Sequence, residues 1–106
     1  MSARRLDDLH ADLLGFCDEV IAATKATTKE RFLDDLSAIR AMERRLELIG
    51  EVATRLGDDV PDADVDWQDL RGLRIMLAHV YNRILPERLW SYATSGIPRI
   101  RAALGD

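Results

Sequence analysis

The chain has 106 residues, of which 47% are apolar and 32% charged, and its formal net charge is −4. This length predicts one domain over residues 1–106 with a modest core, and the acidic balance argues against a free-standing nucleic-acid binder that relies on overall positive charge. A single cysteine excludes an intrachain disulfide, and no apolar run approaches the ~20 residues needed to cross a bilayer, so we expect a cytoplasmic protein without membrane contact.

The first predicted helix spans about residues 6–24. Its apolar side chains recur at spacings of three and four, which is the pattern of a helix with one face in a core. Cys17 lies within this pattern, and we interpret it as a small core residue. The positions that define the stripe are Leu6, Leu9, Leu13, Phe16 and Val20.

A second helical region is predicted over residues 29–56. Thr27 and Glu30 have the spacing of a capping box at its start, and the pair Asp34-Asp35 predicts a break after the first turn. Gly50 in mid-helix costs ~1 kcal/mol relative to alanine, which a close helix crossing would explain. Glu51 has two interpretations of equal weight, a buried partner for an arginine near the motif of the helix predicted over residues 66–82, or a surface carboxylate.

An acidic, proline-containing loop over residues 58–65 follows, and it lacks the ordered ligand spacing of a calcium-binding loop, so we expect no metal. The next predicted helix, residues 66–82, has one apolar stripe for the core. Its opposite side carries Gly72, Ile75, Met76 and His79 where a surface helix would carry charges. This second face predicts a further contact, either with another helix of the same chain or with a partner chain.

The last predicted helix starts near Pro86, which is suited to a first helical turn. Leu89, Ala93 and Ile97 lie on its apolar side. Pro98, preceded by Ser95-Gly96, cannot donate a backbone hydrogen bond and predicts a kink or a short interruption. With no strand pattern in the chain, we predict an all-α, up-and-down bundle of four to five helices.

Three blocks of sequence, in order, resemble the HEPN superfamily and within it the HepT group of small helical toxins. These are FLDDLSAIRAMERRLELIGEVATRL over residues 32–56, Arg74-x4-His79-x-Tyr81 on a helix after a tryptophan, and LWSYATSGIPRIRAAL over residues 89–104. The resemblance covers the chain from about Leu6 onward. It implies a HEPN-like bundle that dimerises through the motif helix and is paired with an MNT nucleotidyltransferase antitoxin.

The residue types of this motif suit metal-independent RNA cleavage. Histidine can act as base or acid near neutral pH, and the planar guanidinium of Arg74 can bind phosphate oxygens. Because each chain supplies one His79, a homodimer would supply one imidazole for each proton transfer. The resemblance further implies that the antitoxin inactivates the toxin by adding AMP to Tyr81. No cofactor is expected.

Structural roles for these side chains are the competing interpretation. An arginine and a histidine in one helix often serve packing, and Tyr81 could be an aromatic packed at a helix end. Ile75 stands where the family often has a polar residue, commonly asparagine. We therefore keep as an alternative a non-catalytic helical partner subunit that binds a nucleotidyltransferase or nucleotide.

Overall fold

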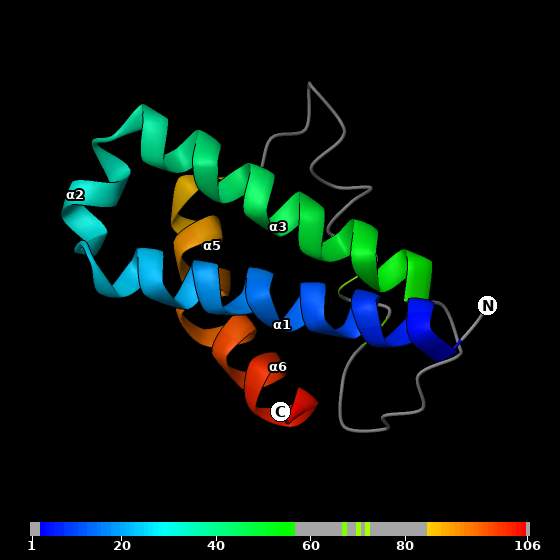
Figure 1. Cartoon of the computed structure of the whole chain (residues 1–106). Helices are drawn as coiled ribbons and strands as arrows, with labels where there is room; N and C mark the ends of the chain where they lie inside the picture. Colours follow the sequence, from blue (N-terminus) through cyan, green and yellow to red (C-terminus); the bar gives the residue numbers. More distant parts are fainter. Residues whose placement is uncertain (1–2, 57–66, 68–69, 71, 73–84, 106) are drawn as a thin grey trace.

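The computed structural model describes residues 3–56, 67, 70, 72 and 85–105. Two long helices, α1 (Ala3–Lys25) and α3 (Leu36–Leu56), run antiparallel and pack along their length. The short helix α2 (Lys29–Leu33) joins them. A third layer, made of α5 (Pro86–Ser91), the π-helical turn η2 (Tyr92–Gly96) and α6 (Ile97–Leu104), crosses behind this pair (Figure 1).

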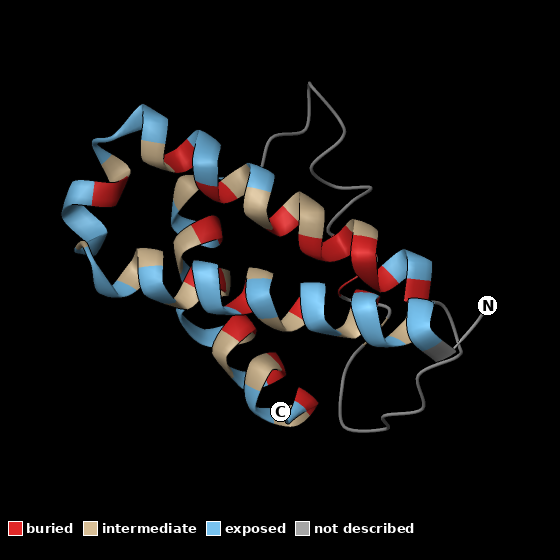
Figure 2. Cartoon of the chain, viewed as in Figure 1, coloured by how far each residue is buried: buried red, intermediate tan, exposed pale blue. Residues whose placement is uncertain are grey.

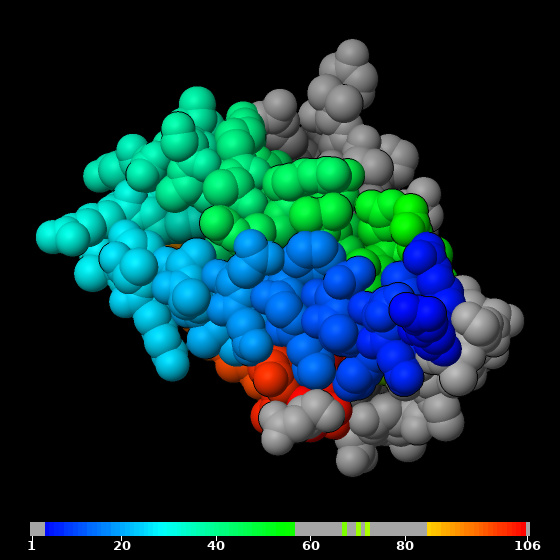
Figure 3. All heavy atoms as spheres, viewed as in Figure 1, coloured from blue at the N-terminus to red at the C-terminus, as the bar shows by residue number. Residues whose placement is uncertain are grey.

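The core lies between these layers, and the buried positions face inward along each helix (Figure 2). The stripe expected for the first helix is confirmed, because Leu13, Cys17 and Val20 are fully buried. On α3 the buried face is continuous over five turns, and its members are Ile39, Met42, Leu46, Ile49, Gly50, Val52, Ala53 and Leu56. Side chains of α1 and α3 meet without a gap on the face shown in Figure 3.

The predicted break near Asp34-Asp35 is confirmed, but the predicted cap is displaced by one residue. Thr28 is the N-cap of α2, and its hydroxyl oxygen accepts a hydrogen bond from the backbone N–H of Arg31. Thr27 lies one position too early, so its spacing to Glu30 does not describe the helix start. A carboxylate oxygen of Asp35 then accepts the N–H of Ala38 at 3.1 Å and so caps α3.

The last helix continues through Pro98 by widening into a π-turn. The N–H of Ile97 donates to the carbonyl of Tyr92, five residues earlier. In a regular helix the Pro98 ring would press against the carbonyl of Thr94, four residues before it, and the wider turn provides the space. The predicted interruption therefore takes the form of one irregular turn, and Pro86 begins α5 as expected.

An ion pair ties the last layer to the first helix. Nε of Arg101 in α6 lies 2.8 Å from a carboxylate oxygen of Asp18 in α1, and another nitrogen of the same guanidinium donates to the carbonyl of Gly105. Gly105 ends α6 with a φ of 69°, a conformation that glycine adopts without strain. Asp18 follows the buried Cys17 in the chain. The ion pair therefore lies beside the contact between α1 and α6.

These elements confirm the predicted all-α, HEPN-like bundle. Among the described helices, none is both long enough and apolar enough to cross a membrane. The single-domain assignment over residues 1–106 stays a prediction.

Candidate active site

The three residues to which the sequence assigns chemistry, Arg74, His79 and Tyr81, lie outside the described residues. So do the apolar positions Ile75 and Met76. The structure describes three positions of the helix predicted over residues 66–82, namely 67, 70 and 72, together with the two other blocks of the family resemblance. These parts show how the fold supports the site.

The beginning of the motif helix is anchored in the core. Trp67, Leu70 and Gly72 are helical. Leu70 is fully buried in the core cluster, and Trp67 is partly buried against it. These two side chains confirm the start of the predicted apolar stripe. Arg74, the candidate phosphate-binding residue, follows Leu70 by four residues in the sequence and lies outside the described residues.

Gly72 is the one described member of the second face predicted for this helix. It is partly exposed, and a Cβ atom placed there would have no neighbour within 4 Å. Among the described residues, none therefore contacts Gly72 at this position. The second apolar face and its partner stay a prediction, because the other three members of that face lie outside the described residues.

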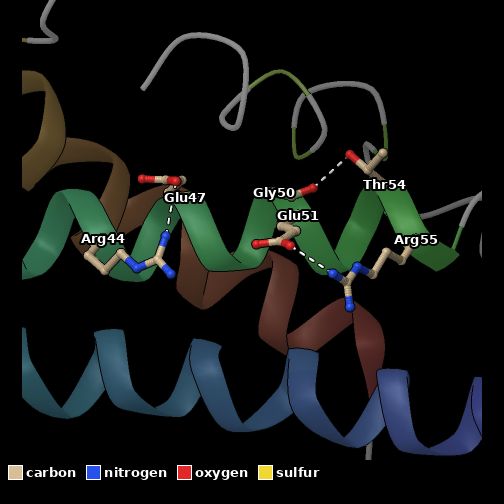
Figure 4. Close-up of polar contacts among 6 residues, drawn as sticks. All are labelled: Arg44, Glu47, Gly50, Glu51, Thr54 and Arg55. Carbon is tan, nitrogen blue, oxygen red and sulfur yellow. Dashed lines mark hydrogen bonds and ion pairs between the residues drawn. The ribbon is translucent and has the colours of Figure 1, made fainter. Parts of the chain in front are cut away.

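The first block of the family resemblance, residues 32–56, includes Ile49, Gly50 and Glu51 near the end of α3. These three residues have different surroundings. Ile49 and Gly50 are buried, as a glycine at a close helix crossing should be. The hydroxyl of Thr54 donates to the carbonyl of Gly50 at 2.8 Å (Figure 4). The Thr54 hydroxyl therefore donates its proton to the backbone of its own helix.

Glu51 is a surface carboxylate, which decides between its two interpretations. One of its oxygens lies 2.9 Å from a guanidinium nitrogen of Arg55, one turn later, and the two side chains are 36% and 55% exposed (Figure 4). A glutamate four residues before a basic residue is the favourable order on a helix, worth ~0.2–0.5 kcal/mol. The signal was present in the sequence, since Arg55 follows Glu51 at this spacing.

Similar local pairs hold four further charged side chains of α3. Arg40 pairs with Glu43 at 2.6 Å, and Arg44 pairs with Glu47 at 3.0 Å. Both pairs lie at the surface, as the alternating charges of this helix indicate. Their guanidinium groups are therefore already neutralised within the helix.

Cys17 is confirmed as a core residue. It is fully buried, and burial raises the pKa of its thiol from 9.0 to about 11. The positive charge of Arg101 opposes this effect and the negative charge of Asp18 adds to it. A thiol that stays protonated under ordinary conditions has no nucleophilic role.

The comparisons with known proteins agree with the blocks described above. A family profile with the description "HepT-like: Ribonuclease HepT-like" matches residues 13–105. The chain is 30% identical over 103 residues to "Putative RNase MJ1380" of Methanocaldococcus jannaschii, with 95% of this chain and 94% of that protein covered.

Two further relatives have the same kind of name. "Putative RNase MJ0127" of the same organism is 32% identical over 89 residues, covering 82% of this chain and 74% of its own length. "Putative RNase TTE0752" of Caldanaerobacter subterraneus subsp. tengcongensis is 29% identical over 90 residues, covering 83% and 80%. No solved structure gives a significant match.

Proposed function

The chain belongs to the HepT-like ribonuclease family, and we propose that it is the RNA-cleaving toxin of a HEPN/MNT toxin–antitoxin pair. The observation that carries this proposal is the family match across residues 13–105, which includes the Arg74-x4-His79-x-Tyr81 motif. Three relatives named as RNases, from two organisms, support a ribonuclease rather than another helical protein. The toxin would act in the cytoplasm on RNA.

The proposed reaction is transfer within the RNA backbone without a metal ion. A neutral His79 removes the proton of the 2′-hydroxyl, and the 2′-oxygen forms a bond to the adjacent phosphorus. The bond from phosphorus to the 5′-oxygen breaks, and a protonated His79 gives that oxygen its proton. Arg74 stabilises the charge on the phosphate oxygens during the exchange.

This scheme needs two imidazoles, which a homodimer built on the motif helix supplies. Support comes from the second apolar face predicted for that helix and from Gly72, which no described residue approaches. A glycine without a Cβ atom permits two helices to come close. Two copies would also bring two Arg74 side chains to the shared cleft.

Inhibition would use Tyr81, which lies two residues after His79. The antitoxin, an MNT nucleotidyltransferase, would transfer AMP from ATP to the phenolic oxygen, with pyrophosphate as the leaving group. The added nucleotide is bulky and negatively charged. Beside Arg74 it would occupy the position of the RNA phosphate and block cleavage.

A second function is favoured by one residue. Ile75 places an apolar side chain directly after Arg74, where a polar group could orient the site. On that basis the alternative is a non-catalytic subunit that binds a nucleotidyltransferase or nucleotide and uses the same helix for assembly only. The two functions differ in a single respect that can be measured, namely cleavage of RNA by the purified chain.

The test is RNA cleavage by the His79→Ala variant. We expect a loss of ~10²–10⁴-fold, the usual contribution of an acid–base group. The matched control is His10→Ala on α1, because His10 and His79 are the two histidines of the chain. Arg74→Lys should also be impaired, since lysine lacks the planar fork that holds two phosphate oxygens. Equal cleavage by the wild type and the His79 variant would exclude His79 as the acid–base group.

A further inference from the structure

Two stretches of the sequence contain arginines and no acidic residue, residues 70–86 and residues 88–104, and the second lies within the part of the chain that the structure describes. From Arg88 to Leu104 the sequence contains three arginines and no acidic residue, although the whole chain carries −4. Glu87, in the first turn of α5, is the only carboxylate of α5, η2 and α6. The outer side of α1 has the opposite character, with exposed Asp7, Asp8, Asp12 and Glu19.

Two of these three arginines project from the solvent side of the last layer. Arg88, Ser91, Ser95 and Arg99 follow one another at spacings of three, four and four residues, so they lie on one side of the helix. All four are exposed. We call this set the Arg88–Arg99 face.

Within the described part of the chain, neither guanidinium on this face is neutralised by a carboxylate. Arg88 and Arg99 make no ion pair or hydrogen bond to any described residue, whereas Arg101 is paired with Asp18. The arginines of α3 at positions 40, 44 and 55 each have a glutamate partner within four residues. Unpaired guanidinium groups that are already in place bind phosphate without first breaking an internal ion pair.

The hydroxyl groups between the arginines are also available. Ser91 and Ser95 form no side-chain hydrogen bond among the described residues, while the Thr94 hydroxyl donates to the carbonyl of Trp90 at 2.8 Å. A serine hydroxyl can donate to a phosphate oxygen or exchange hydrogen bonds with a ribose hydroxyl. The π-turn places Ser91 and Ser95 between the two arginines.

We propose that the Arg88–Arg99 face binds the sugar–phosphate backbone of the RNA substrate. The two arginines are eleven residues apart, which corresponds to roughly 16 Å along the helix. That spacing suits two separate phosphates of one strand better than a single phosphate. Contacts to phosphate and ribose carry no sequence information, so this face would supply affinity and the motif helix would supply chemistry. The inference rests on the proposed ribonuclease function for the identity of the strand.

The experiment measures binding separately from cleavage. A fluorescent 2′-O-methyl oligouridine cannot be cut by 2′-oxygen attack, so its anisotropy reports affinity alone. Each phosphate contact on a single strand contributes a slope of about 0.7 to the dependence of log affinity on log salt concentration. Between about 1 M and about 50 mM salt, one such contact therefore raises the affinity about eightfold. The double variant Arg88→Gln/Arg99→Gln should therefore bind about 60-fold more weakly at about 50 mM, with a slope reduced by about 1.4.

The matched control is Arg40→Gln/Arg44→Gln, which removes the same charge from α3, where both guanidinium groups are paired. We expect this control to bind as the wild type does, within about twofold. Equal losses in both double variants would show a general charge effect and overturn the inference. An unchanged slope in the Arg88/Arg99 variant, or loss of binding to a partner protein with RNA affinity intact, would overturn it as well.

The two proposals fail in different ways. If the wild type binds the oligouridine through this face but does not cut ordinary RNA, the binding face stands and the nuclease proposal is refuted. If the wild type cuts RNA and the Arg88/Arg99 variant cuts it equally well at low RNA concentration, the nuclease proposal stands and the binding face is refuted.

Discussion

Replacement of Leu70 by alanine tests whether the motif helix is an integral part of the core. Leu70 is 0% exposed and belongs to the core cluster, so truncation removes three carbon atoms from a fully packed site. Such a change costs ~2–5 kcal/mol, through lost burial and the cavity that remains. With a cost of about 3 kcal/mol and about 4–8 °C per kcal/mol for a domain of this size, the melting temperature should fall by at least about 12 °C.

The assay is urea unfolding followed by circular dichroism at the helix band, with thermal melts in parallel. Leu85→Ala is the matched control, because the same atoms are removed from a side chain that is 64% exposed. Its free energy of unfolding should change by no more than about 0.5 kcal/mol. Similar losses for the two variants would refute the conclusion that Leu70 anchors the motif helix.

Two further predictions concern α1 and η2. Because burial raises the pKa of Cys17 from 9.0 to about 11, the unfolded chain loses the thiol proton first as the pH rises. The thiol's contribution to the free energy of unfolding is therefore present below pH 9 and is lost between pH 9 and about 11. The loss amounts to up to about 2.7 kcal/mol. Cys17→Ala should remove this part of the pH dependence, as measured by urea unfolding. Gly15→Ala should raise the free energy of unfolding by about 1 kcal/mol, since nothing lies within 4 Å of the new methyl group on this exposed helical site. Gly96→Ala should fall short of that gain, because its methyl group would meet the Tyr92 ring at 3.1 Å, and an equal gain in both variants, read from thermal melts, would contradict the ring contact.

The helical part of the fold was predictable because one physical signal dominates it. Apolar residues at spacings of three and four specify which side of each helix is buried, and Leu13, Leu46 and Ile97 are fully buried as that pattern requires. The same signal does not determine the exact first residue of a helix. Thr27 and Thr28 are both chemically able to cap α2, and only the backbone conformation at Thr28, with φ −118° and ψ 164°, selects it.

Irregular geometry was harder to predict than periodic geometry. Pro98 shows in the sequence that one backbone hydrogen bond must be missing, but a break, a kink and a wider turn all satisfy that condition. The choice depends on the packing of Ala93 and Ile97, which are both fully buried and must stay on the core side. A π-turn keeps both of them there, whereas a break would release one.

The candidate active site stays a prediction from residue type, and the sequence does not specify its geometry. Arg74 and His79 diverge by ~140° around one helix, so a single helix does not bring them to one point. In the proposed mechanism their cooperation would depend on a second chain, and no pattern within one sequence specifies how two copies meet. For Glu51 the opposite holds, because its partner Arg55 is local and the spacing alone could have decided between the two interpretations.

The net charge of the chain does not exclude the RNA-binding face proposed above. Electrostatic interactions between exposed groups are screened over about 8 Å at physiological ionic strength, so a phosphate responds to the charges of the face that it touches. The carboxylates of α1 and the arginines of the Arg88–Arg99 face lie on different helices, and the carboxylate of Asp18 already neutralises Arg101 where α1 and α6 meet. An acidic chain can therefore present a basic surface to RNA. Its acidic face would repel the strand and favour its approach from the side of Arg88 and Arg99.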